Sequence, residues 1–430
     1  MKQSFITTIF LALVIAITSC NSANKTNTKE TTATFPFALL KERNSLLAKA
    51  GDWISVQNKA YEICEKIKRD SNDIKSKLML AQLYMQEARI TGEHPYYYPA
   101  TLTILNSVLK QSPDNFEALA FKSSVQLSLH HFSDALITGK KAVTINPDNA
   151  FIYGVLCDAN VELGNYDEAV KMSDKMQSLR PGLESYSRAS YLREIYGNNQ
   201  AAIEAMKMAV QAGLPGSEEA SWAGNTMSHL LENTGDLEHA EEISNIVLTQ
   251  RPSYAFATDA LGRIALARGE YDKAIQYFET AIEGMPEFSF YENMAEAYAA
   301  KGNQAKATEI YKSVITMLNE DAQSGHYADL ELANVYTKLG DYDNALKHAQ
   351  IEYKRRPANI DVNSVVAWVY FKKGNSAEAK KYMDVALRMG TKNAMILKKA
   401  GMIEIALNNK KSGEVLLAQA QKINPFLKEI

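Results

Sequence analysis

The chain has 430 residues, of which 46% are hydrophobic and 23% are charged, with 47 Lys and Arg against 50 Asp and Glu. These proportions are ordinary for a soluble protein. A net charge of −3 argues against a nucleic-acid-binding protein and against attraction to an anionic lipid surface.

Residues 1–20 have the organisation of an export signal. Lys2 places a positive charge near the amino end, residues 5–17 are largely apolar, and the segment ends with Ile17-Thr18-Ser19-Cys20. The apolar stretch is too short for a comfortable membrane span. Its last four residues resemble the lipobox of bacterial lipoproteins, which implies cleavage before Cys20, diacylglycerol on its sulfur and acylation of the new amino end. The alternative is an ordinary secretory signal with a chance cysteine.

Residues 21–35 follow as a linker rich in Ser, Thr and Asn, without apolar periodicity. Such a segment is a flexible tether with a reach of roughly 20 Å. With lipid on Cys20, the tether would hold the chain at a membrane of the bacterial cell envelope. Asn21 is not the aspartate associated with inner-membrane retention in enteric bacteria, and no acidic run follows Cys20. By resemblance to such lipoproteins, we expect the periplasmic face of the outer membrane.

From residue 36 onward, prolines recur with a period close to 34 residues. Eight of the eleven prolines follow this period, at positions 113, 147, 181, 215, 252, 286, 357 and 425. A turn glycine five residues before a small residue runs in phase, as in Gly164 and Ala169 or Gly340 and Ala345. Glycine ends one helix at positive φ, a neighbouring Asp or Asn caps the next helix, and the proline closes that helix. The pattern predicts a stack of antiparallel helix pairs.

These positions resemble the tetratricopeptide repeat family. The copy at residues 255–288 matches it best, through Leu261, Gly262, Ala274, Phe278, Ala281 and Pro286. The resemblance implies an all-α, right-handed α-solenoid of about eleven repeats over residues 36–430. Its inner surface would be lined mainly by the first helix of each pair and would bind protein or peptide segments. Three positions depart from the pattern: His130 and Asn408 replace the turn glycine, and Gly413 replaces a helix alanine.

The two cysteines after Cys20 are expected to be buried thiols. Cys157 occupies the position where other copies carry a small residue, namely Gly262, Ala295, Ala333, Ala367 and Gly401. That position is a close contact between helices. Cys64 lies on a predicted helix of a different unit, and a disulfide between the two would have to bridge turns of the solenoid.

A tyrosine-rich insertion interrupts the second unit at Thr91–Ala100, where Tyr96, Tyr97 and Tyr98 stand between two prolines. Prolines stiffen a loop, and tyrosines offer rigid contact area that is common on recognition surfaces. The segment is therefore either a contact loop or a set of tyrosines packed over neighbouring helices.

Candidate residues of the inner surface are found by applying the family's first-helix numbering to each repeat. They are Trp222, Asn225 and His229 in one unit and Trp368 and Phe371 in another. Such side chains could stack on an extended peptide or a sugar, although tryptophans at helical spacing are more often core. The lysine and asparagine set with which some family members hold a terminal carboxylate is incomplete, because Leu330 replaces the lysine beside Asn334.

Two further features depart from the regular stack. Met317–Tyr327 is predicted to be a lengthened helix or connection. The chain ends five residues after Pro425 without an evident polar cap, so we expect Leu416, Leu417 and Ala420 to be partly exposed. That exposure would permit self-association through the C-terminal repeat.

No catalytic or metal-binding motif is present in the sequence: HExxH, a glycine-rich phosphate loop, GxSxG and CxxC are all missing, and the histidines form no i, i+4 pair. We therefore expect no cofactor and no enzyme activity. The preferred hypothesis is a membrane-tethered adaptor that binds protein segments in the envelope. The alternative is a ligand-capture lipoprotein that binds a glycan or small molecule through exposed, clustered aromatics. An enzyme with a dispersed active site is the least supported.

Overall fold

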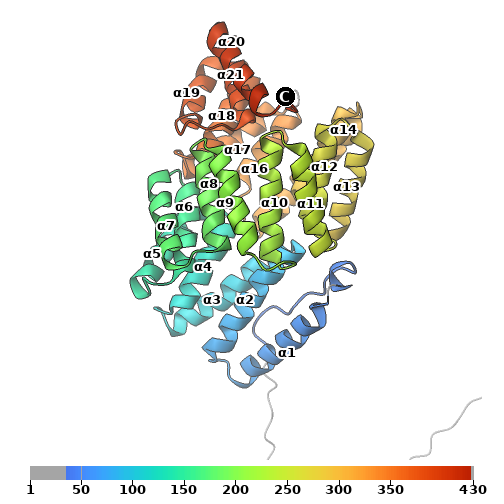
Figure 1. Ribbon diagram of the computed structural model, residues 1–430. Coiled ribbons are helices and arrows are strands. Elements are labelled where there is room, and N and C mark those ends of the chain that lie inside the picture. Colours follow the sequence, from blue (N-terminus) through green and yellow to red (C-terminus); the bar gives the residue numbers. More distant parts are fainter. Residues whose placement is uncertain (1–34, 50, 428–430) are drawn as a thin grey trace, which may run out of the picture. The chain divides into compact units, whose positions relative to one another are not determined.

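Ten antiparallel helix pairs and one preceding helix form the part of the chain that the computed structural model describes, residues 35–49 and 51–427 (Figure 1). These residues contain no strand. A short 3-10 turn, η1 (Leu47–Lys49), precedes the unpaired helix α1 (Trp53–Arg69). The first five pairs are α2 (Ile74–Thr91) with α3 (His94–Gln111), α4 (Phe116–Ser128) with α5 (Phe132–Ile145), α6 (Ala150–Glu162) with α7 (Tyr166–Leu179), α8 (Leu183–Ile195) with α9 (Asn199–Ala212), and α10 (Glu218–Asn233) with α11 (Leu237–Gln250). The other five are α12 (Ala255–Ala267) with α13 (Tyr271–Gly284), α14 (Phe288–Ala300) with α15 (Gln304–Gln323), α16 (Asp329–Lys338) with α17 (Tyr342–Arg355), α18 (Ile360–Lys372) with α19 (Ser376–Ala386), and α20 (Ala394–Ala406) with α21 (Lys410–Ile423).

The turn within each pair follows the predicted chemistry. The turn glycines have positive φ, including Gly164 at 78° and Gly340 at 77°. His130 and Asn408, which replace glycine, adopt the same left-handed conformation at 60° and 64°. The adjacent Asp or Asn often caps the next helix, as Asp341 does by accepting a hydrogen bond from the backbone of Asn344. The repeat phase read from the sequence is therefore confirmed.

The first predicted unit is incomplete. Instead of a first helix, residues 35–46 form an irregular segment before η1 and α1. Arg43 anchors this segment through buried hydrogen bonds of 2.6 and 2.8 Å to the carboxylate of Glu87. Residues 35–49 and 51–427 thus contain ten complete pairs and one unpaired helix, where about eleven repeats were expected.

The tyrosine-rich segment is helical and not a loop, because α3 begins at His94. Tyr97 and Tyr98 are buried. The Tyr96 hydroxyl donates to the carbonyl of Leu39 at 2.6 Å, and the Tyr97 hydroxyl accepts from the backbone N–H of Lys41 at 3.1 Å. The contact-loop interpretation is therefore wrong for Tyr97 and Tyr98, because the cluster packs inside the N-terminal unit and holds the irregular segment.

The small-residue position within each pair is a close contact, as predicted. A Cβ atom added to Gly262 would lie 2.4 Å from the ring of Phe278. Cys157 is buried at this position, and both it and Cys64 are free thiols. Three copies carry serine there, and each hydroxyl donates to a carbonyl of the paired helix twelve residues later: Ser123 to Ala135, Ser190 to Ala202 and Ser228 to Ala240, at 2.7 to 2.8 Å.

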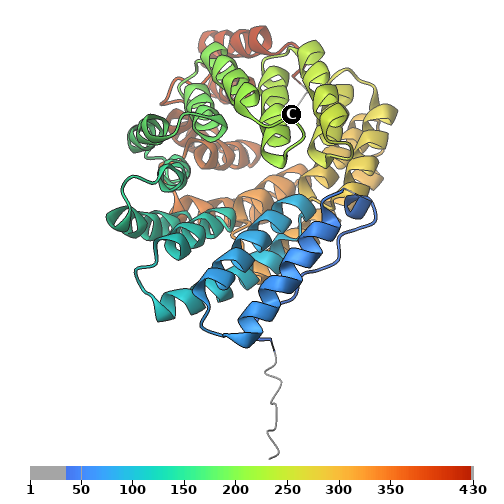
Figure 2. The ribbon, with the colours of Figure 1, turned by 60° about the horizontal axis from the view of Figure 1, so that its bottom comes forward.

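Segments far apart in sequence meet because the pairs wind through more than one superhelical turn (Figure 2). Tyr327 donates its backbone N–H to the carbonyl of Leu129 at 3.1 Å, and Asn424 donates to the carbonyl of Glu232, 192 residues earlier. Most such hydrogen bonds join residues 192 to 198 apart, which is roughly six repeats of 34 residues. We call this set of contacts the seam. It joins residues 129–131, 161–166, 197 and 232–235 of the first turn to residues 325–327, 356–360, 388–390 and 424–425 of the second.

The lengthened region at Met317–Tyr327 contributes to the seam. Helix α15 continues to Gln323, and the short connection after it reaches the turn between α4 and α5. There the carbonyl of Gly325 lies 2.7 Å from Nε2 of His131. Of the two predicted forms, a lengthened helix or a lengthened connection, the lengthened helix is confirmed, because α15 has 20 residues.

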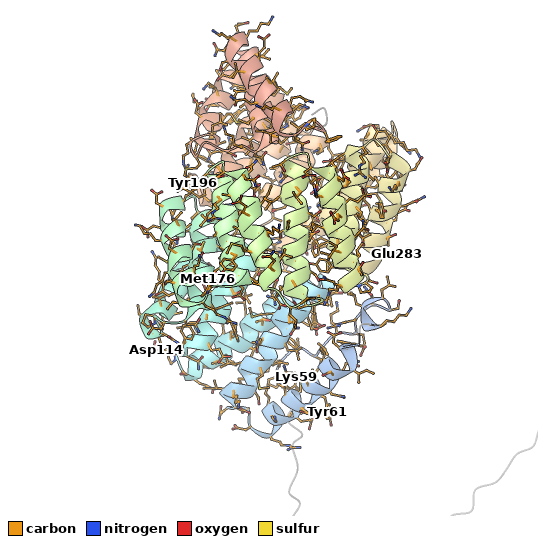
Figure 3. All side chains as sticks on the ribbon, in the orientation of Figure 1. Lys59, Tyr61, Asp114, Met176, Tyr196 and Glu283 are labelled. Atoms are coloured by element: carbon orange, nitrogen blue, oxygen red, sulfur yellow. The ribbon has the colours of Figure 1, made fainter. Side chains whose placement is uncertain are left out.

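Exposed apolar residues occur at both ends of the described chain. Tyr61 projects from α1 (Figure 3) and is 68% exposed. At the C-terminal end, Val415 is exposed, while Leu416 and Leu417 are partly buried. The expectation of partial exposure is wrong for Ala420, which is buried against Ala394 and Leu397 of the preceding helix.

Candidate functional site: two cavities on the inner surface

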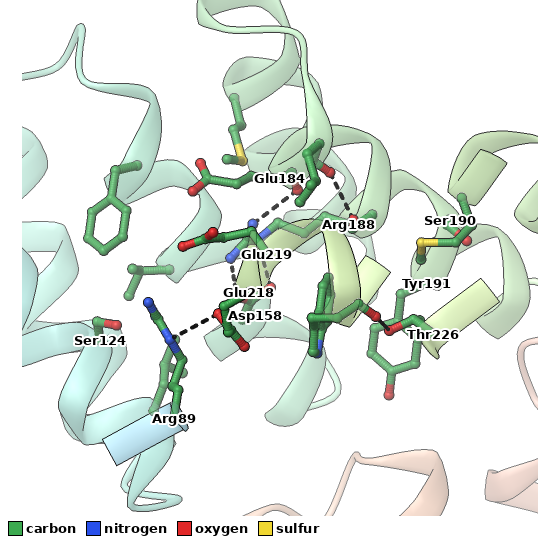
Figure 4. Close-up of a pocket in the computed structure, with 18 of the residues that line it drawn as sticks. Arg89, Ser124, Asp158, Glu184, Arg188, Ser190, Tyr191, Glu218, Glu219 and Thr226 are labelled. Atoms are coloured by element: carbon green, nitrogen blue, oxygen red, sulfur yellow. Dashed lines mark hydrogen bonds and ion pairs between the residues drawn. The ribbon is translucent and has the colours of Figure 1, made fainter. Parts of the chain in front are cut away.

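The first cavity lies on the concave side of the first turn and has a volume of about 520 Å³ (Figure 4). Most of its lining comes from α4, α6, α8 and α10, which are first helices of their pairs, as expected for the inner surface. Its apolar wall includes Leu127, Phe151, Val155, Leu183, Met206, Trp222 and Leu230. Trp222 is 44% exposed, so much of its indole is available for contact.

Two arginines of the first cavity are already paired with carboxylates. Arg188 binds Asp158 through two hydrogen bonds of 2.9 and 2.6 Å, and the nearest nitrogen of Arg89 lies 3.7 Å from the carboxylate of Glu218. Three further carboxylates line the cavity without an ion pair to any described residue: Glu184, Glu194 and Glu219. The cavity therefore carries five carboxylates and only two guanidinium groups.

The electrostatics of this surface are negative. Burial raises the pKa of the Glu194 carboxyl, and repulsion from Asp361 raises it further, while His229 opposes the rise. Burial together with the charges of Asp361 and Glu162 also holds the pKa of Tyr191 well above its usual range. Tyr191 is 41% exposed, and it lines the cavity. A cation placed here would relieve this repulsion.

The second cavity is larger, about 1030 Å³, and is lined by α12 to α18, α20 and the C-terminal residues Pro425, Phe426 and Leu427. Trp368 lies in its wall and is only 7% exposed. Two lysine ammonium groups lie near its indole, Lys372 at 4.9 Å and Lys399 at 5.6 Å from the ring centroid. Lys338 is a third lysine in this lining, and Glu296 supplies its single carboxylate. The formal charge of the lining is therefore positive. The two cavities therefore have opposite signs.

Binding is the chemistry that these surfaces support. Within residues 35–49 and 51–427, no group of three or more His, Cys, Asp or Glu side chains could hold a metal ion. None of the helices described is both long enough and apolar enough to cross a membrane. The concave walls instead combine exposed aromatic surface with charged groups, which suits the capture of an extended polypeptide segment.

A comparison with protein families gives the same repeat. The sequence profile of the family described as Tetratricopeptide repeat matches residues 260–323 and 330–394, and the same spacing and helix pairing extend through the ten pairs. The chain therefore contains tetratricopeptide repeats. Such repeats form α-solenoids, and that fold supports a role as a protein-interaction scaffold.

The curated relatives of this chain are distant. The chain is 24% identical to the protein CTR9 homolog of Arabidopsis thaliana over 273 residues, which cover 61% of this chain and 24% of that one. It is 22% identical to a TPR repeat-containing protein of Methanocaldococcus jannaschii over 386 residues, which cover 73% of this chain and 66% of that one. The chain thus spans about a quarter of the first relative and just under two thirds of the second.

Among solved structures, the human IFIT1 dimer with PPP-AAAA has a TM-score of 0.48 and 14% sequence identity, over 86% of this chain and 88% of that one. A tetratricopeptide repeat protein from Parabacteroides merdae has a TM-score of 0.35 and 18% identity, over 56% of this chain and 93% of that one.

The structure does not bring the predicted site residues together. Trp222 lines the first cavity, whereas Trp368 lines the second, where Phe371 stacks on it with ring centroids 5.0 Å apart. Asn225 and His229 lie on α10 with Trp222 but do not line the first cavity, and Nδ1 of His229 is 3.7 Å from Glu232. Tyr96, Tyr97 and Tyr98 line neither cavity. Cys20 lies outside the described residues.

Sequence reasoning missed the charged residues of both cavities. Asp158, Arg188 and Glu194 lie on first helices, as Trp222 does, but isolated charges on a helix usually indicate a solvated face. A sequence signal was available for one pair. Asp158 and Arg188 carry opposite charges 30 residues apart on adjacent first helices, and in the structure they face each other.

Proposed function

We propose that this chain is a non-enzymatic scaffold that holds segments of partner proteins on the inner surface of its solenoid. The observation that carries the proposal is the first cavity, where Trp222 exposes 44% of its surface on a concave apolar wall. An exposed tryptophan in a pre-formed cavity is a common anchor point for a bound partner, because covering it removes a large apolar area from water.

We further propose that a lipid on Cys20 attaches the chain to a membrane of the bacterial cell envelope, at the periplasmic face of the outer membrane. The support is the sequence of residues 1–20 and the Ser, Thr and Asn content of residues 21–35. Replacing Cys20 with serine removes the acylated sulfur. We expect the Cys20→Ser protein to leave the membrane fraction and to lose labelling by radioactive palmitate. Retention of label and membrane association would contradict the anchor.

The ligand-capture alternative requires exposed aromatics that cluster at one place. Trp222 is exposed, but Trp368 is buried and lines the other cavity. A binding site for a sugar ring built on both tryptophans is therefore not favoured.

Self-association through the C-terminal repeat also stays a prediction. Val415 and Ile405 are half exposed on α21 and α20. Analytical ultracentrifugation of the chain and of a Val415→Ser variant tests it, since loss of a dimer in the variant would support this surface as the contact.

An affinity capture from solubilised envelopes tests the scaffold. The parent chain, a Trp222→Ala variant and a matched Glu279→Gln variant are used as baits; Glu279 is exposed on α13 and lines neither cavity. We expect the parent and Glu279→Gln to retain the same defined protein, and Trp222→Ala to retain at least about tenfold less of it. Equal retention by all three baits would contradict a scaffold that binds through this cavity.

A further inference from the structure

The first cavity combines two properties that together define the chemistry of its ligand. Its apolar wall presents Trp222, the one exposed tryptophan of the three in the chain, since Trp53 and Trp368 are 5% and 7% exposed. An aromatic or long aliphatic side chain placed against this indole would remove apolar surface of both partners from water.

The second property is an excess of negative charge that the protein itself does not balance. The guanidinium of Arg188 is held by Asp158 and by the carbonyls of Gly154 and Glu184, at 2.6 to 3.1 Å, so it is not available to other carboxylates. Arg89 is directed to Glu218. The carboxylates of Glu184, Glu194 and Glu219 therefore face the cavity without an ion pair to a described residue.

Neighbouring elements add to this charge. Asp361 at the start of α18 and Glu162 at the end of α6 both act on Tyr191 and on each other, and Asp361 also acts on Glu194. Basic groups offset part of this charge: Arg356 pairs with Glu162 and Glu352, Lys399 acts on Asp361, and His229 acts on Glu194. A positive ligand group would thus enter a partly dehydrated site that favours it, whereas a carboxylate would be repelled.

We propose that the first cavity binds a protein segment in which a lysine or arginine lies next to a large apolar side chain. The cation sits between Glu184 and Glu219, in the first turns of α8 and α10, and the apolar side chain covers Trp222. This inference rests on the proposed scaffold function and specifies the class of partner. The second cavity provides an internal contrast, because its three lysines and one glutamate would disfavour the same segment.

Fluorescence anisotropy with two labelled synthetic peptides tests the proposal on the full chain. One peptide contains lysine, leucine and phenylalanine, and the other has glutamate in place of every lysine. We expect the basic peptide to bind at least about tenfold more tightly than the acidic one, and its affinity to fall as salt is added.

Variants that replace glutamate with glutamine test which carboxylates bind the basic peptide. A double variant, Glu184→Gln with Glu219→Gln, keeps side-chain size and removes two negative charges, so we expect about a three- to tenfold loss of affinity for the basic peptide. The control Glu279→Gln removes one negative charge far from the cavity lining and should leave the affinity unchanged. Thermal unfolding of each variant establishes that it is folded.

Quenching of tryptophan fluorescence by acrylamide gives a second readout without a label. Because Trp222 is the exposed tryptophan, the basic peptide should reduce quenching in the parent chain and have no effect in Trp222→Phe.

Two results separate this inference from the function on which it rests. If the acidic peptide binds as tightly as the basic one and protects Trp222 equally, the charge assignment is wrong while the cavity remains a binding site. If neither peptide binds and envelope capture also retains no protein through Trp222, both the inference and the scaffold proposal are wrong.

Discussion

Turn glycines have two different environments in this chain, although they occupy the same position of the repeat. Gly164 has a φ of 78°, and a Cβ atom added to it would lie 2.3 Å from the backbone of Ala358 across the seam. Gly340 has a φ of 77°, but a Cβ atom added there would meet nothing within 4 Å. Gly164 is therefore required for the approach of two superhelical turns, and Gly340 only for its own turn.

This difference predicts that replacing glycine with alanine lowers the free energy of unfolding more at position 164 than at position 340. Gly340→Ala should lower the free energy of unfolding by about 1 kcal/mol, because alanine is strained at positive φ. Gly164→Ala should lower it by roughly 3 kcal/mol, because the seam must also move apart. Urea unfolding followed by circular dichroism measures both. Equal losses in the two variants would contradict a close contact at Gly164.

His130 makes the seam sensitive to acid. Burial, with repulsion from His326, Arg356 and His131, lowers the pKa of His130 to about 3. Its other neighbours across the seam are Glu331, at 3.8 Å, and the carbonyl of Tyr327, at 3.1 Å. Because an unfolded histidine has a pKa of about 6.5, the unfolded chain gains a proton that the folded chain does not. Stability is therefore lost as the pH falls from about 6.5 towards 3.

We expect His130 to account for about 1 kcal/mol of lost stability near pH 5, after allowing for screening of a side chain that is 28% exposed. His130→Asn should remove this part of the pH dependence, because asparagine tolerates the left-handed turn, as Asn408 does in the last pair. Thermal unfolding of both proteins at neutral and acidic pH measures the difference. An unchanged slope with pH in the variant would show that His130 is not responsible.

Helices α6 and α18 illustrate how the seam is built from elements that are not neighbours in the repeat stack. The side-chain amide of Asn359, just before α18, donates to the carbonyl of Glu162 at the end of α6, at 3.0 Å. The hydroxyl of Tyr166, at the start of α7, accepts from the backbone N–H of Ile360 at 3.0 Å. A solenoid usually depends on contacts between adjacent repeats. This seam adds coupling between repeats that are roughly six apart.

Tyr166→Phe tests that coupling with the loss of one oxygen atom. It leaves the buried N–H of Ile360 without a partner, so we expect a loss of about 1–2 kcal/mol and faster hydrogen exchange along the seam. The control is Tyr61→Phe, since Tyr61 is exposed on α1 and should be neutral. Hydrogen exchange that rises only within α7, and not in α18, would contradict coupling across the seam.

The helix pairs could be predicted from the sequence because their signals are local. Each turn glycine, cap and small contact residue lies within one repeat, so periodicity alone placed the ten pairs. The seam could not be predicted, because its partners are 192 or more residues apart and depend on the pitch of the superhelix. The sequence left two alternatives open for the tyrosine cluster for a similar reason, since Tyr96 and Tyr97 bond to residues 39 and 41, which follow no repeat pattern.

The candidate site was predicted only in part. Repeat positions identified Trp222 as inward-facing, but nothing in the sequence showed that Trp368 would be buried or that the two tryptophans would line different cavities. The charge of each cavity depends on which carboxylates find a partner, as Asp158 does and Glu194 does not. Such pairing is set by distances between helices.

At the scale of the whole molecule, the solenoid divides its inner surface into two regions of opposite charge, although the net charge of the chain is only −3. The first is acidic and presents an exposed tryptophan; the second is basic and buries one. A polypeptide held along this surface would therefore meet different electrostatic environments, which favours one orientation over the other.

Site-specific photocrosslinking in intact cells tests most directly whether the first cavity holds protein partners. A photoreactive amino acid is placed at position 222 and, as a control, at position 279 on the outer helix α13. The account predicts discrete protein adducts from position 222 and none of the same size from position 279. Adducts of the same proteins in equal amounts from both positions, or none from position 222, would contradict binding at the inner surface.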